Sequence, residues 1–173
     1  MLCRHVHLLC FAIALGAASA QQPKGLLPPE ELSESEAQLI LKEQKPKGHV
    51  EAAFRVSDAR LSSALQHARA SRYPEASQDL DFYTGLVTYV DRYTRGLPGE
   101  RRKERGQCLK LIEQRLFKQS ATLNAVAREL PYDYRGAGER AVETAKQVRL
   151  RALDDLLGDG SMFKETDGAQ GGH

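Results

Sequence analysis

The feature that most constrains the fold is a pair of adjacent segments with helical periodicity between His49 and Gly96, joined at Ser71-Arg72-Tyr73-Pro74. In each segment, apolar or small residues recur at alternating spacings of three and four, which forms the stripe that one helix presents to a partner. Pro74 suits the first turn of a helix, where a missing N–H costs little. The two segments therefore predict a helical hairpin. Its stripes are Val50, Phe54, Ser57, Leu61, Ala64 and Ala68, then Ala76, Leu80, Tyr83, Val87 and Val90.

The second of these segments carries a further apolar stripe one position away from the first. Its members are Phe82, Leu86, Tyr89 and Tyr93. A helix with two adjacent stripes can contact two neighbours at once, so we expect it to be the central helix of a bundle. The sequence leaves open whether the second stripe is covered within the chain or by another copy. A homo-oligomer therefore stays an open alternative.

Two more helical segments follow the break at Leu97-Pro98-Gly99. The third begins at Glu100 or later, and Gln119 is the single polar member of its stripe. The fourth runs from about 137 to 157. Together the segments predict an all-α fold, an up-and-down bundle of about four helices over residues 48–158. The apolar positions are Leu109, Ile112, Leu116, Leu123, Val126 and Leu130, then Ala141, Val142, Ala145, Val148, Ala152, Leu153 and Leu156.

The two ends of the chain are set apart from this helical part. Arg4, the apolar run from Leu8 to Leu15 and the small residues Ala18-Ser19-Ala20 have the features of a secretory signal peptide. The run is too short for a bilayer-spanning helix, although an uncleaved anchor is the alternative. We predict removal of residues 1–20 and an exported protein, periplasmic or extracellular, without stable membrane insertion after cleavage. The glycine-rich polar tail 159–173 is predicted to be disordered.

Residues 21–47 are predicted to form an extended lead-in and one short helix. Ser33 and Glu36 have the spacing of a capping box, in which each side chain accepts a backbone N–H of the other residue. The helix should end near Lys45, before Pro46. It offers few apolar residues, so we expect it to be mobile or loosely docked. These residues are Ala37, Ile40 and Leu41.

Charge gives no global indication of a partner, since the net charge of the chain is only +2. We therefore expect no nucleic-acid partner. The strongest local charge is a basic cluster, where positive residues in a first helical turn oppose the helix dipole. Two interpretations stay open: a solvated helix end, or contact with an acidic partner such as the helix that carries Glu34 and Glu36. The cluster consists of Arg101, Arg102, Lys103 and Arg105.

The tyrosines divide into two groups. Tyr132 and Tyr134 fall in a predicted turn, where residues face solvent, and they are candidates for partner binding. Tyr83, Tyr89 and Tyr93 lie at helical spacing. They are predicted to be core residues whose hydroxyls reach the rim, and a ligand-stacking surface is the alternative.

The sequence offers no catalytic or metal-binding constellation. Once Cys3 and Cys10 leave with the signal peptide, Cys108 is the single cysteine, predicted to be a structural thiol, with an intermolecular disulfide as the alternative. The remaining histidines are not spaced as metal ligands on a helix, and there is no haem-attachment motif. We therefore expect neither an enzyme nor a cofactor or metal. These histidines are His49, His67 and His173.

Two resemblances accompany these patterns. Ala64 to Leu86 resembles one tetratricopeptide-type unit, through Tyr73, Ala76, Leu80 and Tyr83, but a shift of about 34 residues finds no second copy. The stretches 53–61 and 148–158 are similar in style to uncharacterised exported helical proteins of bacteria. That resemblance implies an all-helical exported protein and brings no known activity, substrate or functional residue.

The sequence thus predicts a non-enzymatic exported helical protein that acts through protein contacts in the bacterial envelope, with an unknown protein partner. The alternative is a helical module that holds a small apolar or aromatic ligand between its helices, with tyrosines lining the pocket.

Overall fold

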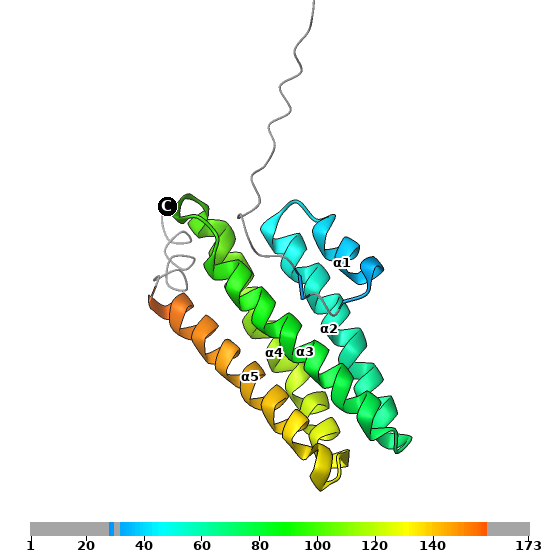
Figure 1. Ribbon diagram of the computed structural model, residues 1–173. Coiled ribbons are helices and arrows are strands. Elements are labelled where there is room, and N and C mark those ends of the chain that lie inside the picture. Colours follow the sequence, from blue (N-terminus) through cyan, green and yellow to red (C-terminus); the bar gives the residue numbers. More distant parts are fainter. Residues whose placement is uncertain (1–27, 30–31, 159–173) are drawn as a thin grey trace, which may run out of the picture.

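The four long helices run antiparallel in an up-and-down bundle, and one short helix packs outside it (Figure 1). The computed structural model describes residues 28–29 and 32–158. The all-α prediction is confirmed, whereas the predicted signal peptide 1–20 and the predicted disordered tail 159–173 lie outside the described residues. The elements are α1 (Glu34–Leu41), α2 (Pro46–Arg69), α3 (Tyr73–Arg95), the 3₁₀ helix η1 (Gly99–Arg101), α4 (Arg102–Glu129) and α5 (Tyr132–Gly158).

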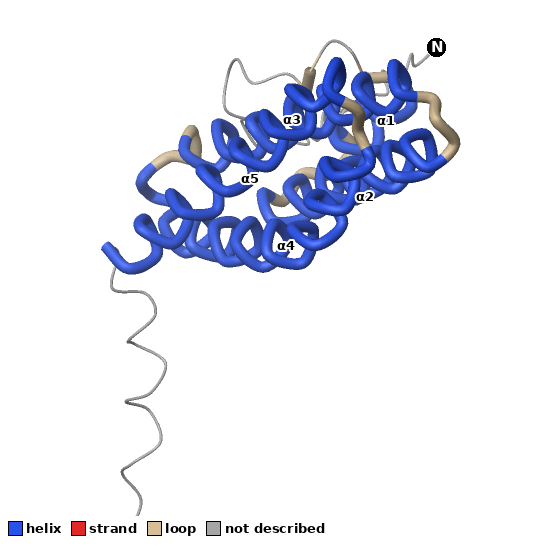
Figure 2. The backbone as a smooth tube through the Cα atoms, turned by 90° about the horizontal axis from the view of Figure 1, so that it is seen from below, coloured by secondary structure: helices blue, strands red, loops and turns tan. Residues whose placement is uncertain are grey.

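Each long helix packs closely against two neighbours, so the four helices occupy the corners of a square, and α3 and α4 are also in contact across its diagonal. In Figure 2 the four long helices lie side by side, with α1 outside them. Helices α2 and α5 lie at opposite corners, and each packs against both α3 and α4. Helix α3 contacts α2, α4 and α5, so the prediction that it meets two neighbours at once is confirmed, but α4 also contacts the three other long helices and α3 is not the single central helix. The square has two outer faces that matter below: one formed by α2 and α3, the other by α4 and α5.

The core is made by the predicted stripes. Every member of the stripes in the first three long helices is buried except Phe82 of the second stripe, and in α5 only Val142 and Leu153 are half-buried. Gln119 is the buried polar exception, and hydrogen bonds explain it. Its amide oxygen accepts from the Tyr83 hydroxyl at 3.0 Å, and its amide nitrogen donates to the Ser57 hydroxyl at 3.0 Å. Because an unsatisfied buried amide costs about 1–3 kcal/mol, this bonding ties α2, α3 and α4 in one register.

The second stripe of α3 is covered by the same chain. Pro29, in the segment before α1, packs over Gly85 of α3. The buried His49 ring stacks on Tyr93 with 4.2 Å between ring centroids and hydrogen-bonds the Tyr89 hydroxyl. The open question of what covers this stripe is thus answered for these residues without a second copy.

Several predicted boundaries move. The short helix ends at Leu41, not near Lys45, and Pro46 begins α2 because proline fits a first helical turn. Helix α4 begins at Arg102 after η1, close to the early start that the sequence left open. Helix α5 begins at Tyr132, so the predicted turn at 132–134 is wrong: this segment is the first turn of a helix.

The two hairpin joints differ in geometry. After α2, Ser71 adopts a left-handed conformation with φ 59°, a position that glycine usually takes. The Arg72 N–H donates to the His67 carbonyl at 2.9 Å, and the Ser71 N–H donates to the Ala68 carbonyl at 3.1 Å. This is a Schellman-type helix end. After α4, Leu130 is extended, with φ −79° and ψ 131°, and Pro131 follows it without a left-handed residue.

Candidate binding groove between α4 and α5

The predicted basic cluster lies at the start of α4, and two of its members are held by carboxylates of the chain itself. An Arg101 guanidinium nitrogen lies 3.6 Å from a Glu104 oxygen, and Arg105 lies 3.9 Å from Asp155 of α5. Arg102 and Lys103 are exposed. The suggested contact with the acidic helix α1 is wrong, because Glu36 bonds another arginine, described below.

The two predicted tyrosines lie at the other end of the bundle. Tyr132 is 83% exposed, and Tyr134 is half-buried against Tyr73, with 5.9 Å between ring centroids. The 28 residues of α4 separate this end from the basic cluster, a distance of about 40 Å at ~1.5 Å per residue. The six candidate residues therefore do not form one site.

Helix α1 packs on α2, on the outer side of the α2/α3 pair, and Pro29 before it packs over Gly85 of α3. Ile40 has no exposed surface, although α1 has few other apolar residues to bury. The predicted capping box is present, since the Ser33 N–H donates to Glu36 and the Glu36 N–H donates to the Ser33 hydroxyl. The expectation that this helix is loosely docked is wrong.

A partly buried charge cluster joins α1 to α2 and α3. The Arg60 guanidinium donates two hydrogen bonds to the Glu36 carboxylate, at 2.9 and 2.7 Å, and one to Asp79 at 3.3 Å. Its planar group also lies over the Phe82 ring, 4.5 Å from the centroid. Burial opposes ionisation of Glu36, but the bonds from Arg60 and Ser33 outweigh it and lower the pKa of that carboxyl.

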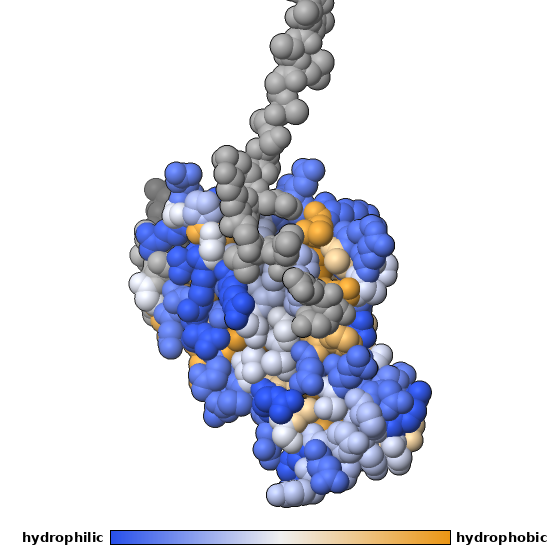
Figure 3. Space-filling view, viewed as in Figure 1, coloured by the Kyte–Doolittle hydropathy of each residue, from blue (hydrophilic) through white to orange (hydrophobic). Residues whose placement is uncertain are grey.

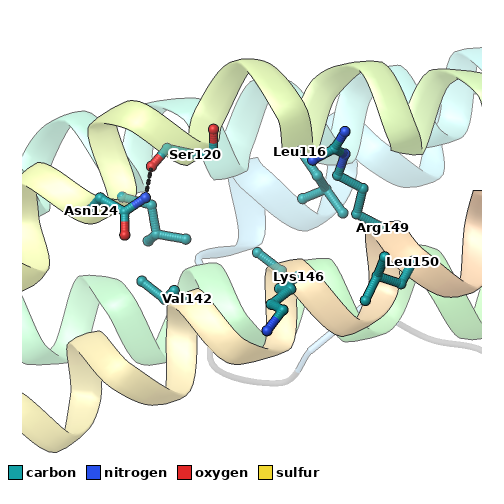
Figure 4. Close-up of a pocket in the computed structure, with 9 residues that line it drawn as sticks. Leu116, Ser120, Asn124, Val142, Lys146, Arg149 and Leu150 are labelled. Carbon is teal, nitrogen blue, oxygen red and sulfur yellow. Dashed lines mark hydrogen bonds between the residues drawn. The ribbon is translucent and has the colours of Figure 1, made fainter.

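The outer face of α4 and α5 has a groove, and no described segment lies over it. The groove encloses about 370 Å³, and its floor is apolar: Leu116 and Leu123 come from α4, Val142 and Ala145 from α5. Figure 4 shows side chains from the two facing helices lining it, with the Asn124 amide bonded to the Ser120 carbonyl at 2.8 Å. Phe117 and Leu150 beside it are 60% and 46% exposed.

A second hollow of about 510 Å³ continues the groove along the same two helices, since Asn124 lines both. Together they extend from Leu116 to Arg128 on α4, which is about 18 Å of helix. The charged residues that line the two hollows are four cations and, within the described chain, one carboxylate. They are Arg128, Arg135, Lys146 and Arg149, and Glu139.

Only one of these cations is engaged by a carboxylate of the described residues. Arg149 donates to Glu113 at 3.1 Å, and its guanidinium lies over the Phe117 ring, 4.7 Å from the centroid. Arg128, Arg135 and Lys146 make no ion pair with another described side chain. The groove is therefore apolar at its floor and positive along its rim.

The side of the molecule that carries α1 has a different surface. On the side shown in Figure 3, hydrophobic residues gather around α1, where Leu39 and Leu41 are partly exposed, and the surface elsewhere is mostly hydrophilic.

Two side chains with reactive chemistry, Cys108 and His49, lie in the core, whereas His67 is half-buried with its Nδ1 3.0 Å from an Asp79 oxygen. Cys108 is fully buried, as predicted, and burial, together with the Glu104 carboxylate, raises the pKa of its thiol to about 12. Burial also lowers the pKa of His49, against the carbonyl and carboxylate of Glu43. The described residues hold no cluster of three or more metal-ligating side chains.

The groove is not among the features predicted from the sequence, although two residues could have indicated it. Phe117 and Leu150 fall outside the stripes of α4 and α5, so helical geometry points them away from the core. A large apolar residue off the stripe is the available signal. Tyrosines were predicted to line a ligand pocket, but neither of the two hollows has a tyrosine among its lining residues.

Comparisons of this chain with protein-family models, curated proteins and solved structures find no match. Among the described residues, no helix combines the length and the apolar character needed to cross a membrane.

Proposed function

We propose that the protein is a non-enzymatic, exported helical bundle that works through protein contacts, and that the α4/α5 groove is its contact surface. The observation that carries the proposal is Phe117, a large aromatic side chain 60% exposed beside an apolar groove. Exposed aromatic residues at the edge of apolar hollows are typical of protein-binding sites. Export to the bacterial envelope rests on the signal-like N-terminus and on the resemblance to exported helical proteins.

The burial of the reactive groups supports a binding role over catalysis. A nucleophile or general base must reach its substrate, and Cys108 and His49 are enclosed by packed helices. The residues that the bundle does expose around the groove are suited to noncovalent contact. The basic cluster at 101–105 stays a prediction as a secondary contact, through its exposed members Arg102 and Lys103.

Site-specific photocrosslinking tests this proposal. A benzophenone amino acid replaces Phe117, and the exposed Ser62 of α2 serves as the matched control position. In envelope extracts, position 117 should give one recurrent protein adduct that position 62 does not give. No adduct at 117, or the same adducts at both positions, would contradict the α4/α5 contact surface.

A second candidate function has one observation in its favour: the volume of about 370 Å³ lies within the range of small-molecule pockets. The ligand would be apolar and would contact Leu116, Leu123 and Val142, not tyrosines. Thermal-shift screening of residues 21–173 tests it, because a ligand that binds only the folded state raises Tm. The rise should disappear in Val142→Trp, where the larger side chain occupies the groove.

A further inference from the structure

From the covered and the open face together, we infer that the occupant of the α4/α5 groove is an acidic amphipathic helix of a partner protein. The inference rests on the proposed function and adds the chemistry and the shape of the partner segment. Three observations carry it: the manner in which α1 docks on the opposite face, the charges along the groove, and the dimensions of the groove.

The chain itself shows how a helix docks on an outer face of this bundle. Helix α1 has acidic residues in its first turn, buries Ile40 and gives the Glu36 carboxylate to Arg60. The open face has the corresponding features. It presents an apolar floor for one buried residue and cations beside that floor, among them Lys146 of α5.

The charges select an acidic occupant. The groove is lined by four cations and one carboxylate of the described chain, and only Arg149 is paired, with Glu113. A basic or neutral helix would leave Lys146 and Arg128 facing like charge or no charge, whereas glutamates on a docked helix would face them. A second copy of the chain is disfavoured by the same argument, since symmetric pairing of this face places cations against cations.

The dimensions select a helix over a small ligand. The two hollows follow the helix pair for about 18 Å, which matches about twelve residues of helix at ~1.5 Å each. Apolar residues at i, i+3, i+4 and i+7 of such a helix fill a groove of this kind. Small-molecule sites enclose most of their ligand, whereas Phe117 and Leu150 stand exposed at the edge here and would flank a docked helix.

Peptide binding to residues 21–173 tests the inference. The probes are two panels of fluorescent peptides of about 14 residues, each with Leu, Ile or Phe at i, i+3, i+4 and i+7. One panel has glutamate on the flanking positions, and the other has lysine at the same places. Fluorescence anisotropy at low and high salt measures Kd.

Members of the acidic panel should bind with Kd in the micromolar range, more weakly at high salt, and the lysine panel should not bind. The double substitution Lys146→Glu and Arg128→Glu should weaken binding by about tenfold or more, and Phe117→Ser by a similar factor. Arg69→Glu, on the exposed surface of α2 outside the groove, should leave Kd unchanged. Circular dichroism checks that each variant is folded.

Three results would overturn the inference: no acidic peptide with Kd below about 1 mM, equal binding of the two panels, or an equal effect of Arg69→Glu. The photocrosslink at position 117 separates this failure from failure of the proposed function. An adduct that maps to a basic, non-helical or second-copy segment overturns the acidic helix while a contact surface remains. An absent adduct removes the contact surface as well.

Discussion

The α2/α3 side and the α4/α5 side of the bundle each consist of an antiparallel helix pair with an arginine on the outer surface, Arg60 and Arg149 respectively. Over the first, α1 buries Ile40 and Arg60 holds Glu36. Over the second, no described segment lies, and Arg149 turns to Glu113 and to the exposed Phe117. An arginine beside apolar residues thus holds a helix of the same chain on one side, whereas on the other side the apolar residues Phe117 and Leu150 stay exposed among the described residues.

The largest expected effect comes from making the same kind of truncation on the two faces. Ile40→Ala removes a side chain with no exposed surface and should lower the free energy of unfolding by about 2–4 kcal/mol. Leu150→Ala, 46% exposed on the open face, should change it by less than about 0.5 kcal/mol. Urea unfolding followed by circular dichroism measures both.

Equal destabilisation by the two variants would break the comparison between a covered and an open face. A small loss in Ile40→Ala alone would mean that α1 contributes little to the bundle in solution. Proteolysis between 41 and 46 would then show whether α1 detaches before the rest unfolds.

The second prediction concerns the charges that hold α1. Arg60→Met removes both bonds to Glu36 and the bond to Asp79, and should cost about 1–3 kcal/mol at neutral pH. The equivalent Arg149→Met on the open face should cost less, because Arg149 has a single carboxylate partner near the surface.

Acid titration sharpens this result. The pKa of Glu36 is lowered in the folded protein, so its contribution to stability is fully present above the ordinary value of 4.5 and is lost as pH falls through the folded pKa. Below about pH 4.5, the wild type should therefore lose its advantage over Arg60→Met and Glu36→Gln. An advantage that persists unchanged in acid would show that the ion pair does not hold α1.

The sequence predicts those features that depend on residues close together in the chain, and it does not predict contacts between distant residues. The stripes and the capping box at Ser33 and Glu36 depend on spacings of three and four, so they were predicted and are present. The bond between Glu36 and Arg60 joins residues 24 positions apart, and nothing local specifies it. The short helix was therefore expected to be loose.

The candidate site could not be predicted for the same reason, because its residues are far apart in the sequence. The basic cluster and the turn tyrosines were conspicuous in sequence, but the length of α4 separates them. The groove is formed by residues of ordinary type on two helices, and only the pairing of α4 with α5 brings Leu116 and Val142 together. Phe117 carried the one local signal, because it lies off the stripe of its helix.

A third prediction tests how closely the open pair is packed beneath its groove. A Cβ atom on Gly138 of α5 would lie 3.0 Å from both Cα and Cβ of Ala127 of α4, whereas one on Gly136 would meet nothing closer than Arg140 at 3.5 Å. Gly136→Ala should stabilise the protein by roughly 0.5–1 kcal/mol through helix propensity. Gly138→Ala should destabilise it by about 1 kcal/mol, because the helices must separate.

Opposite signs in thermal unfolding would show that α4 and α5 approach closely at this end, so that the groove is a hollow between packed helices and not a gap between loose ones. A gain in both variants would show that the pair gives way easily, and would weaken the argument for a preformed groove.

The smallest expected effect is that of Ser71→Gly at the joint between α2 and α3, and Leu130→Gly at the other joint is its contrast. Ser71 holds φ 59° at the end of α2, which costs a residue with a Cβ about 1 kcal/mol, so Ser71→Gly should stabilise the α2/α3 hairpin by roughly 0.5–1 kcal/mol. Leu130 at the α4/α5 joint is extended and buried, so Leu130→Gly should destabilise the protein by losing apolar contacts without relieving strain. Urea unfolding measures whether each substitution raises or lowers the free energy of unfolding. Destabilisation by Ser71→Gly would mean that the left-handed joint is not strained. The flexibility that glycine adds to the unfolded chain would then outweigh any relief of strain in the folded one.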